Sequence, residues 1–597
     1  MQKMLRILNY SPVMRTNVTM ALNHSPRDDS VLSRDVSKRA SGRCLLLLSG
    51  NTPLMICDFA KLRLYALPLL LASLCPAQTT KPSPADNLNQ PKRIEWFRDQ
   101  GFGIFIHWSV DSQLGTVISH SLVDASPEYT QRFFDDLPTT FSPDKFSADA
   151  IARLVKISGA RYMVFTTKHH SGFAMFATAT NSFNIMNTPF HRDITGELFA
   201  AARKQGIATG VYFSPDDFYW LNQHHIPIAR SVPQVQFAAN PGLLRYDQQQ
   251  LTELLTHYGH VDIAFFDGEA QGLRELAWRL QPDIVVTRGA LETPEQYVPG
   301  SPLPGAWEAN LTMGTAWQYQ PQHEQYKSGP ELIRLLIQTR ARGGNLLLNV
   351  GPKPDGELPI EQEARLREIG LWMFVNSDAI YGVRPWNITN ENDIWFTRSD
   401  DGTTLYAVVD RPWKRGTWID LVLQSVRATR QTEISVLGQN SKIYEYQPKI
   451  DPTPKWSQEA DGLHIHAMRT QRLQDNSAWP NPAVLRITHV EQAFTPPVVH
   501  TLAPEPIADM NTVRLRGEWI NAGSPATVQV GFEYRSISGE DKNARTAPWK
   551  AVPLMSTSRP GPFSFEANVF QPGIQYEVRA VVKHPILTIY GEQIRVP

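Results

Sequence analysis

The chain has 597 residues, of which 58 are Lys or Arg and 58 are Asp or Glu, so its formal net charge is zero. This balance argues against a nucleic-acid partner, because phosphate binding needs a clustered basic excess, and an aromatic content of 10% excludes a wholly disordered chain. The length predicts about three or four domains, and beyond the N-terminal region no segment is apolar over the roughly 18 residues of a membrane span.

An apolar stretch in the N-terminal region has the pattern of a secretory signal. Residues 64–74 are almost entirely apolar, come after Lys61 and Arg63, and are followed by Cys-Pro-Ala at 75–77. This pattern predicts cleavage after Ala77 and a secreted or periplasmic protein. The alternative is a buried strand or helix of a folded domain. Because signals begin near the initiator, we consider Met55 as the true start, with residues 1–54 an over-extended reading frame.

The cysteines and the missing motifs exclude several classes of enzyme. Cys44, Cys57 and Cys75 all precede residue 76, so the remaining chain cannot form a disulfide or use a cysteine nucleophile. The sequence has no GxSxG nucleophile elbow and no P-loop. Serine hydrolases of that type and nucleotide-dependent enzymes are therefore excluded.

Between residues 90 and 385, short apolar runs alternate with helical patterns. The runs are Gly103–Ile106, Tyr162–Phe165, Ala208–Phe213, Val261–Phe266, Ile284–Val286 and Leu346–Val350. Near-continuous apolar strands separated by helices indicate a parallel sheet with both faces covered. An open Rossmann sheet would carry a Gly-rich turn after its first strand, and none is present. The pattern therefore predicts an α/β catalytic domain with a (β/α)8 barrel.

After residue 385 the sequence alternates in the manner of strands and loses its helical patterns. Residues 386–495 predict an antiparallel β-sandwich, and Pro496-Pro497 marks a linker. Residues 498–597 are spaced as in a fibronectin-III-like sandwich. The predicted strands are Ile394–Thr397, Thr404–Val409, Trp418–Leu423, Glu433–Leu437, Val513–Trp519, Thr527–Tyr534 and Tyr576–Val582.

Two acidic residues are candidates for the chemistry. Asp267 ends the apolar strand 261–266, where it could act as a nucleophile, a metal ligand or simply a helix N-cap. Glu308 follows Trp307, and a carboxyl desolvated by an aromatic neighbour can hold a proton at neutral pH, as a general acid must. An ordinary, partly exposed glutamate is the alternative at position 308. The other candidates in the same stretch are Glu269, Glu292 and Glu295.

Histidines and aromatic residues also follow the predicted strands. His107, His169 and His170 could ligate a metal, exchange protons or bind substrate hydroxyls. A metal site needs three or four converging ligands, and the sequence has no HExxH motif or nearby carboxylate cluster. Hydroxyl binding is therefore the favoured interpretation, although one of the paired histidines could be a core residue. The neighbouring aromatic residues that could pack against a sugar ring are Trp108, Tyr129, Tyr212, Phe265, Trp307 and Trp317.

Six motifs in order resemble those of glycoside hydrolase family 29, the α-L-fucosidases. They are Phe-Gly-Ile-Phe-Ile-His-Trp from residue 102, Phe-Thr-Thr-Lys-His-His-Ser-Gly-Phe from 165, Gly-Val-Tyr-Phe-Ser-Pro from 210, Val-Asp-Ile-Ala-Phe-Phe-Asp-Gly from 261, Thr-Pro-Glu-Gln from 293 and Gly-Gly-Asn-Leu-Leu-Leu-Asn-Val-Gly-Pro from 343. The resemblance covers residues 90–385 and extends into the following sandwich.

The resemblance implies a retaining exo-glycosidase that removes α-L-fucosyl residues from glycans without a metal or cofactor. It places Asp267 at the nucleophile and Glu308 at the acid/base, and the two carboxyls should lie about 5–5.5 Å apart. It assigns His107, His169, His170 and Tyr212 to the sugar hydroxyls. Arg288 falls beside the sugar and the nucleophile, where a cation would keep Asp267 ionised.

The chain departs from the family pattern around the sugar pocket. Ser171 stands where many members have Asp, and Tyr129 and Phe265 stand where Trp is common. Residues 107–122 also differ from the usual continuation. These changes leave open a related α-L-glycosidase such as an α-L-galactosidase. A catalytically decayed carbohydrate-binding protein and a metal-dependent hydrolase using the three histidines are further alternatives.

Overall fold

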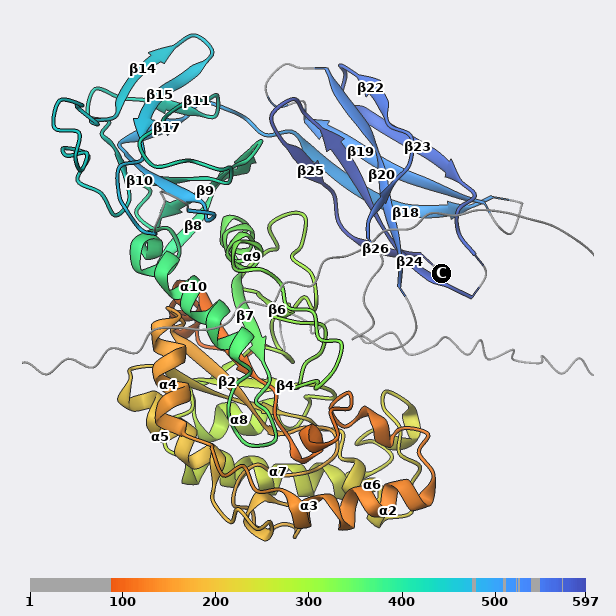
Figure 1. Cartoon of the computed structure of the whole chain (residues 1–597). Coiled ribbons are helices and arrows are strands. Elements are labelled where there is room, and N and C mark those ends of the chain that lie inside the picture. Colours follow the sequence, from red (N-terminus) through yellow and green to blue (C-terminus); the bar gives the residue numbers. More distant parts are fainter. Residues whose placement is uncertain are drawn as a thin grey trace, which may run out of the picture. The chain divides into compact units, whose positions relative to one another are not determined.

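The computed structural model describes residues 87–474, 479–507, 512–521, 523, 527–537, 548–571 and 573–596. The predicted signal segment, its cleavage site at Ala77, the start at Met55 and the three cysteines lie outside these residues. The described chain begins with a parallel sheet surrounded by helices and continues with antiparallel strands only (Figure 1).

Seven parallel strands form the sheet of the N-terminal region. They are β1 (Phe102–Ile106), β2 (Tyr162–Lys168), β3 (Ala208–Phe213), β4 (Ile263–Phe266), β5 (Val285–Val286), β6 (Glu308–Thr312) and β7 (Asn345–Val350). Their order in the sheet is β5-β4-β3-β2-β1-β7-β6. Nearly every strand residue is buried, because helices cover one face and the curled sheet encloses the other. The α/β barrel-type class predicted from the sequence is confirmed, with seven strands in the described sheet.

Strand β6 has no counterpart among the predicted apolar runs. Its sequence, Glu-Ala-Asn-Leu-Thr, alternates polar and apolar residues, yet all five residues are buried. The segment that precedes it runs alongside: Glu292 forms a parallel bridge with Trp307, and Glu295 forms one with Asn310. Strands β5 and β6 are the two edge strands of the sheet, and this segment of the chain connects them while running alongside β6.

Helices pack around the outside of this sheet (Figure 1). They are α1 (Pro91–Gln100), α2 (Pro127–Asp135), α3 (Leu137–Thr140), α4 (Ala148–Ile157), α5 (Ile194–Lys204), α6 (Phe218–Gln223), α7 (Pro241–His257), α8 (Arg274–Leu280), α9 (Gly329–Ala341) and α10 (Ile360–Asn376). Several begin at a side chain that accepts a backbone N–H, as Ser147 does for α4 and Asp217 for α6. No described helix is long and apolar enough to cross a membrane.

Alternation along the strands sends side chains to two different cores. Phe105, Tyr212 and Phe265 belong to a small aromatic cluster enclosed by the sheet. Ile104 and Ile106 belong to the larger core between the sheet and the helices. Residues two apart therefore share a face, and only the enclosed face can present side chains to a site at the mouth of the sheet.

The second region is antiparallel. A five-stranded sheet has the order β13-β16-β10-β9-β8, beside a three-stranded sheet β11-β15-β14 and the pair β12-β17. The strands are β8 (Val383–Glu391), β9 (Ile394–Ser399), β10 (Thr404–Val409), β11 (Trp418–Leu423), β12 (Val426–Ala428), β13 (Ile434–Val436), β14 (Lys455–Glu459), β15 (Gly462–Met468), β16 (Ala483–Thr488) and β17 (Val490–Gln492). Residues such as Phe396, Leu421 and Leu485 form its core.

The last region is also antiparallel and has a core of its own around Trp519, Phe532 and Val578. One sheet has the order β18-β19-β23, and the other contains β21-β20-β24-β25 with β22 against β20 and β26 against β24. The strands are β18 (Val498–Pro506), β19 (Val513–Asn521), β20 (Val528–Ile537), β21 (Lys550–Ala551), β22 (Met555–Thr557), β23 (Gly561–Ala567), β24 (Gln575–Lys583), β25 (Thr588–Tyr590) and β26 (Ile594–Val596).

Candidate active site

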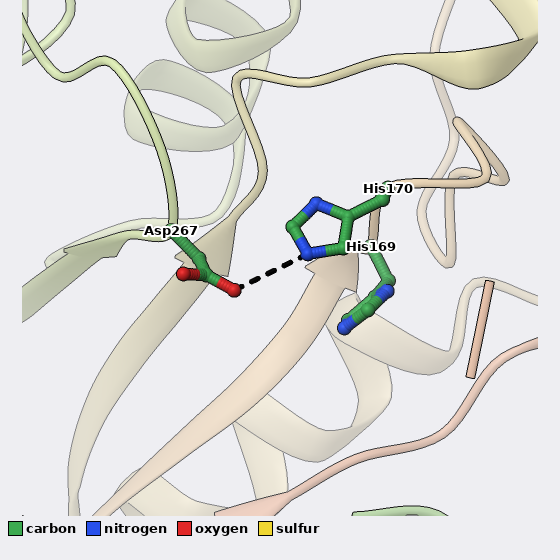
Figure 2. A group of neighbouring side chains, drawn as sticks. All are labelled: His169, His170 and Asp267. Carbon is green, nitrogen blue, oxygen red and sulfur yellow. Dashed lines mark ion pairs between the residues drawn. The ribbon is translucent and has the colours of Figure 1, made fainter. Parts of the chain in front are cut away.

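Asp267 directly follows β4, which places its carboxylate at the C-terminal edge of the parallel sheet (Figure 2). Nη1 of Arg288 donates to its Oδ1 at 2.8 Å, and the hydroxyl of Tyr212 donates to its Oδ2 at 2.8 Å. Nε2 of His170 lies 3.3 Å from the same Oδ2. The side chain keeps 19% of its surface exposed, so the carboxylate is held on several sides and still open to a substrate.

The charges around Asp267 keep it ionised. Burial alone would raise its pKa, but the guanidinium groups of Arg288 and Arg230 outweigh burial and hold the pKa of Asp267 well below its usual range. Arg230 contributes from 3.8 Å, measured from its Nη2 to Oδ1. An aspartate at this place therefore carries its negative charge at neutral pH, as a nucleophile must.

The paired histidines lie beside Asp267 at the end of β2 (Figure 2). Nδ1 of His169 is 2.8 Å from Oγ of Ser119, and Nδ1 of His170 contacts Oγ of Ser214. Burial lowers the pKa of His169 well below its ordinary value and that of His170 to about 3. Both rings are therefore neutral, and each is fixed by a serine.

His107 lies on the enclosed face, one residue after β1. Oδ1 of Asn349 fixes its Nδ1 at 2.6 Å, and its ring centroid lies 4.9 Å from that of Trp317 and 5.4 Å from that of Tyr212. Burial lowers the pKa of His107 to about 3. Three neutral imidazoles and two aromatic rings thus gather near Asp267, which suits hydrogen bonding to the hydroxyls of an uncharged substrate.

The same cluster includes a geometrically possible metal site. Ligand atoms of His169, His170 and Asp267 lie within 4.8 Å of one another (Figure 2). The charges oppose a dication there, because Arg288 binds the carboxylate and Arg230 lies close behind it. The donor set therefore fits a neutral ligand better than the metal-dependent alternative.

A second carboxylate shares the arginine that binds Asp267. Nη2 of Arg288 donates to Oε2 of Glu295 at 2.7 Å, while Nη1 donates to Asp267. The guanidinium carbon lies 4.7 Å from the centre of the Phe265 ring, and Oγ1 of Thr293 accepts from Nε. One planar group thus fixes two carboxyl groups at the mouth of the sheet.

Glu308, the acid/base candidate from the sequence, lies elsewhere. It is the first residue of β6 and pairs with Asn345, the first residue of β7, so it lies at the N-terminal end of the parallel strands. It is wholly buried, and the hydroxyl of Tyr162 donates to its Oε2 at 2.5 Å. Asp267 lies at the opposite, C-terminal end. We therefore correct the assignment, because a carboxyl beneath the enclosed aromatic cluster cannot reach a leaving group at the mouth.

Two predicted aromatic contacts also need correction. Trp108 belongs to the core outside the sheet, where its ring packs beside Phe141 and Phe146. Trp307 precedes β6 at the floor of the sheet and is 1% exposed. Neither side chain is available to a sugar at the mouth. Tyr129 is more peripheral than expected: its hydroxyl donates to Oγ of Ser121 on the loop before α2.

Sequence reasoning missed two charged residues close to the site. Arg230 lies in a stretch without periodicity, so only the folded chain shows that it binds Asp216 and approaches Asp267. Lys168, next to the paired histidines, is fully buried between Asp217 and Asp247. The signal that could have found it is a lysine at the end of an apolar run, because lysine is rarely buried without a charged partner.

The ionised carboxylate at Asp267, held beside a second carboxyl group and three neutral histidines at the mouth of a parallel α/β sheet, is an arrangement typical of glycoside hydrolases. A family model described as α-L-fucosidase matches residues 70–378, just over half of the chain. The chain belongs to this α-L-fucosidase family.

Individual proteins support that placement. Plasma α-L-fucosidase of Rattus norvegicus is 29% identical over 409 residues, which cover 59% of this chain and 84% of that protein. The structure of α-L-fucosidase isoenzyme 1 from Paenibacillus thiaminolyticus is 26% identical, with a TM-score of 0.55 over 67% of this chain and 99% of that one. A Bacteroides thetaiotaomicron fucosidase with a trapped covalent intermediate shares the fold at 22% identity, with a TM-score of 0.54 over 68% of this chain and 97% of that one.

The burial of Glu308 predicts a pH-dependent contribution to stability. Burial raises its pKa from 4.5 to about 8, so the unfolded chain releases this proton at lower pH than the folded chain. The free energy of unfolding should therefore fall by on the order of a few kcal/mol as the pH rises from about 4.5 to 8. Glu308→Gln should lack this fall while keeping fucosidase activity.

Urea unfolding of wild type and Glu308→Gln across that pH range measures the difference. Glu292→Gln, at an exposed position in the preceding segment, is the matched control and should follow wild type. A Glu308→Gln enzyme that loses its activity on substrates with poor leaving groups would return Glu308 to the acid/base role.

Proposed function

We propose that this chain removes terminal α-L-fucosyl residues from glycans by double displacement, with Asp267 as nucleophile and Glu295 as acid/base. The observation that carries this assignment is the guanidinium of Arg288, which donates to both carboxylates. Two carboxyls bound to one such group have a spacing compatible with the roughly 5–5.5 Å of retaining glycosidases.

In the first step a carboxylate oxygen of Asp267 attacks the anomeric carbon, and the bond from that carbon to the leaving oxygen breaks. Glu295 enters this step in its protonated form and gives that proton to the leaving oxygen, so the aglycone departs as a neutral alcohol. As Asp267 becomes an ester, its negative charge disappears. Arg288, Tyr212 and His170 hold the carboxylate during this change, which keeps the attacking oxygen oriented.

In the second step Glu295 accepts a proton from water as the water oxygen attacks the same carbon. The ester bond breaks, Asp267 leaves as a carboxylate, and the sugar is released with its original anomeric configuration. Arg288 and Arg230 stabilise the returning negative charge.

The sugar hydroxyls have defined partners in this proposal. His107, His169 and His170 are neutral, so each ring can donate through one nitrogen and accept through the other. Asn349 and the serines Ser119 and Ser214 set their orientation. An α-L-galactoside differs from an α-L-fucoside by one added hydroxyl. Fucose is the sugar we propose, because the matching family model and the curated relatives are α-L-fucosidases.

The rest of the chain is organised around this catalytic domain. We infer a signal peptide ending at Ala77, a catalytic domain at 90–385, a sandwich at 386–495 and a fibronectin-III-like sandwich at 498–597. Hydrophobic cores centred mainly on each of these three stretches support the division into three folded domains. The curated relatives include plasma enzymes, and a secreted or periplasmic location agrees with a fucosylated glycan as substrate.

The first prediction from this proposal concerns the substrate and the nucleophile together. Among aryl α-L-fucosides, α-L-galactosides and other glycosides, the purified enzyme should hydrolyse the fucosides best. Asp267→Ala should lower turnover by several orders of magnitude, and azide should rescue Asp267→Gly because a small anion can occupy the vacated space. Initial rates measure both effects. A wild-type rate in Asp267→Ala would refute the nucleophile assignment.

A second prediction separates Glu295 from the other acids. Glu295→Ala should lower kcat/KM by about 10²–10⁴-fold on a fucosyl disaccharide, and far less on an activated aryl fucoside that needs no proton donor. Glu308→Gln and Glu292→Gln are the matched controls, and neither should discriminate between the two substrates. Equal losses on both substrates in Glu295→Ala would assign the acid to another residue.

A third prediction tests the signal peptide. When the full reading frame is expressed in a secreting host, mass spectrometry of the exported protein should find an N-terminus at or near Gln78. An exported protein that retains Met1 would contradict cleavage after Ala77.

A further inference from the structure

Aromatic rings and guanidinium groups alternate in one continuous stack in the last region of the chain. The guanidinium carbon of Arg579 lies 3.7 Å from the centre of the Tyr590 ring and 4.1 Å from that of Trp549. The Trp549 ring also contacts Arg535, whose guanidinium carbon lies 4.6 Å from its centre. The same guanidinium carbon lies 4.7 Å from the centre of the Tyr297 ring. Tyr297 does not belong to this region: it lies two residues after Glu295.

The stack is fixed by ion pairs on neighbouring strands. Arg535 on β20 pairs with Glu577 on β24 at 2.6 Å, and Arg579 on β24 pairs with Glu533 on β20 at 2.6 Å. All four side chains are at most about one-eighth exposed. The two ion pairs cross the same strand pair in opposite directions, which holds both guanidinium planes in place for the rings.

The segment that contains Tyr297 has further contacts with the same surface. Oγ of Ser301 donates to the carbonyl oxygen of Tyr590 at 2.6 Å. A Cβ added at Gly300 would lie 2.5 Å from Nη1 of Arg579 and 2.8 Å from the Tyr590 ring, so the backbone approaches the stack too closely for a larger residue. Residues 297–301 therefore contact both ends of the stack, with Tyr297 against Arg535 and with Gly300 and Ser301 against Arg579 and Tyr590.

The same segment holds Glu295 on its other side. Gln296 has a left-handed backbone with a φ of 60°, and its N–H donates to the carbonyl oxygen of Asn310 at 2.8 Å. Its Oε1 accepts from Oγ1 of Thr312 at 3.1 Å. The chain thus turns at Gln296, with Glu295 bound to Arg288 before the turn and Tyr297 bound to the stack after it.

We infer that the last domain positions the acid/base: the stack formed by Arg535, Trp549, Arg579 and Tyr590, with Tyr297 as its outermost ring, fixes residues 297–301 and thereby the carboxyl group of Glu295. This inference rests on the proposed function, since it concerns the role assigned there to Glu295. It gives this C-terminal domain a part in catalysis, although the hydrogen bonds and ion pairs of Asp267 described above all come from residues before position 300.

Two full-length variants test the inference from opposite sides. Arg579→Ala removes one member of the stack, and Gly300→Val pushes the segment away from an intact stack. Each should lower kcat/KM on a fucosyl disaccharide by about 10–100-fold, because small displacements of a proton donor are costly. On an activated aryl fucoside, kcat/KM should change less than about threefold, since that leaving group needs no proton.

Arg516→Ala is the matched control. Arg516 forms an exposed ion pair with Glu505 in the other sheet of the same domain, so this variant should leave both substrates unaffected. Thermal unfolding identifies a variant that has lost its fold, and the other variant then decides the test.

The outcomes separate this inference from the proposed function. If folded variants keep their kcat/KM on both substrates, or lose it equally on both, the positioning role of the domain is overturned. If Glu295→Ala itself fails to discriminate between the substrates, the acid/base assignment is wrong whatever the two stack variants do.

Discussion

The site depends on one guanidinium group that binds two carboxylates. Arg288 follows the short strand β5 and extends over the Phe265 ring to donate to Asp267 with one nitrogen and to Glu295 with another. The geometry requires arginine, because a lysine would offer a point charge in place of a planar fork. The charge of Arg288, reinforced by that of Arg230, outweighs the burial of Asp267 and keeps its carboxylate ionised in a largely enclosed place.

The polar groups around this centre are each fixed by a partner that lies far away in the sequence. Asn349 from the end of β7 orients His107, and Ser119 from the loop after β1 orients His169. Behind the sheet, Lys168 holds Asp217 and Asp247 in a buried ion cluster directly before the paired histidines. Such fixed neighbours let the site meet a substrate without first reorganising, which is the main requirement of electrostatic catalysis.

The mistaken assignment of Glu308 has a clear physical origin. A tryptophan next to a glutamate does indicate a desolvated carboxyl, and burial does raise the pKa of Glu308 to about 8. The sequence could not show at which end of the sheet that carboxyl lies. Strand β6 alternates polar and apolar residues, so its pattern does not predict a buried strand that begins at Glu308. Glu295 was among the alternatives in the same stretch, but nothing local distinguished it.

The sequence by itself determined the α/β class and the positions of most strands, because these depend on continuous apolar runs and the polar residues that end them. That local pattern left the role of Asp267 open, and the expectation of a nucleophile came from the resemblance of six motifs to a known family. The tertiary structure alone decided which carboxyl groups meet. The pairing through Arg288, the approach of Arg230 and the contact between Tyr297 and the last domain join segments that are distant in the chain. Long-range contacts of this kind follow from how the strands curl and pack, which no short stretch of sequence encodes.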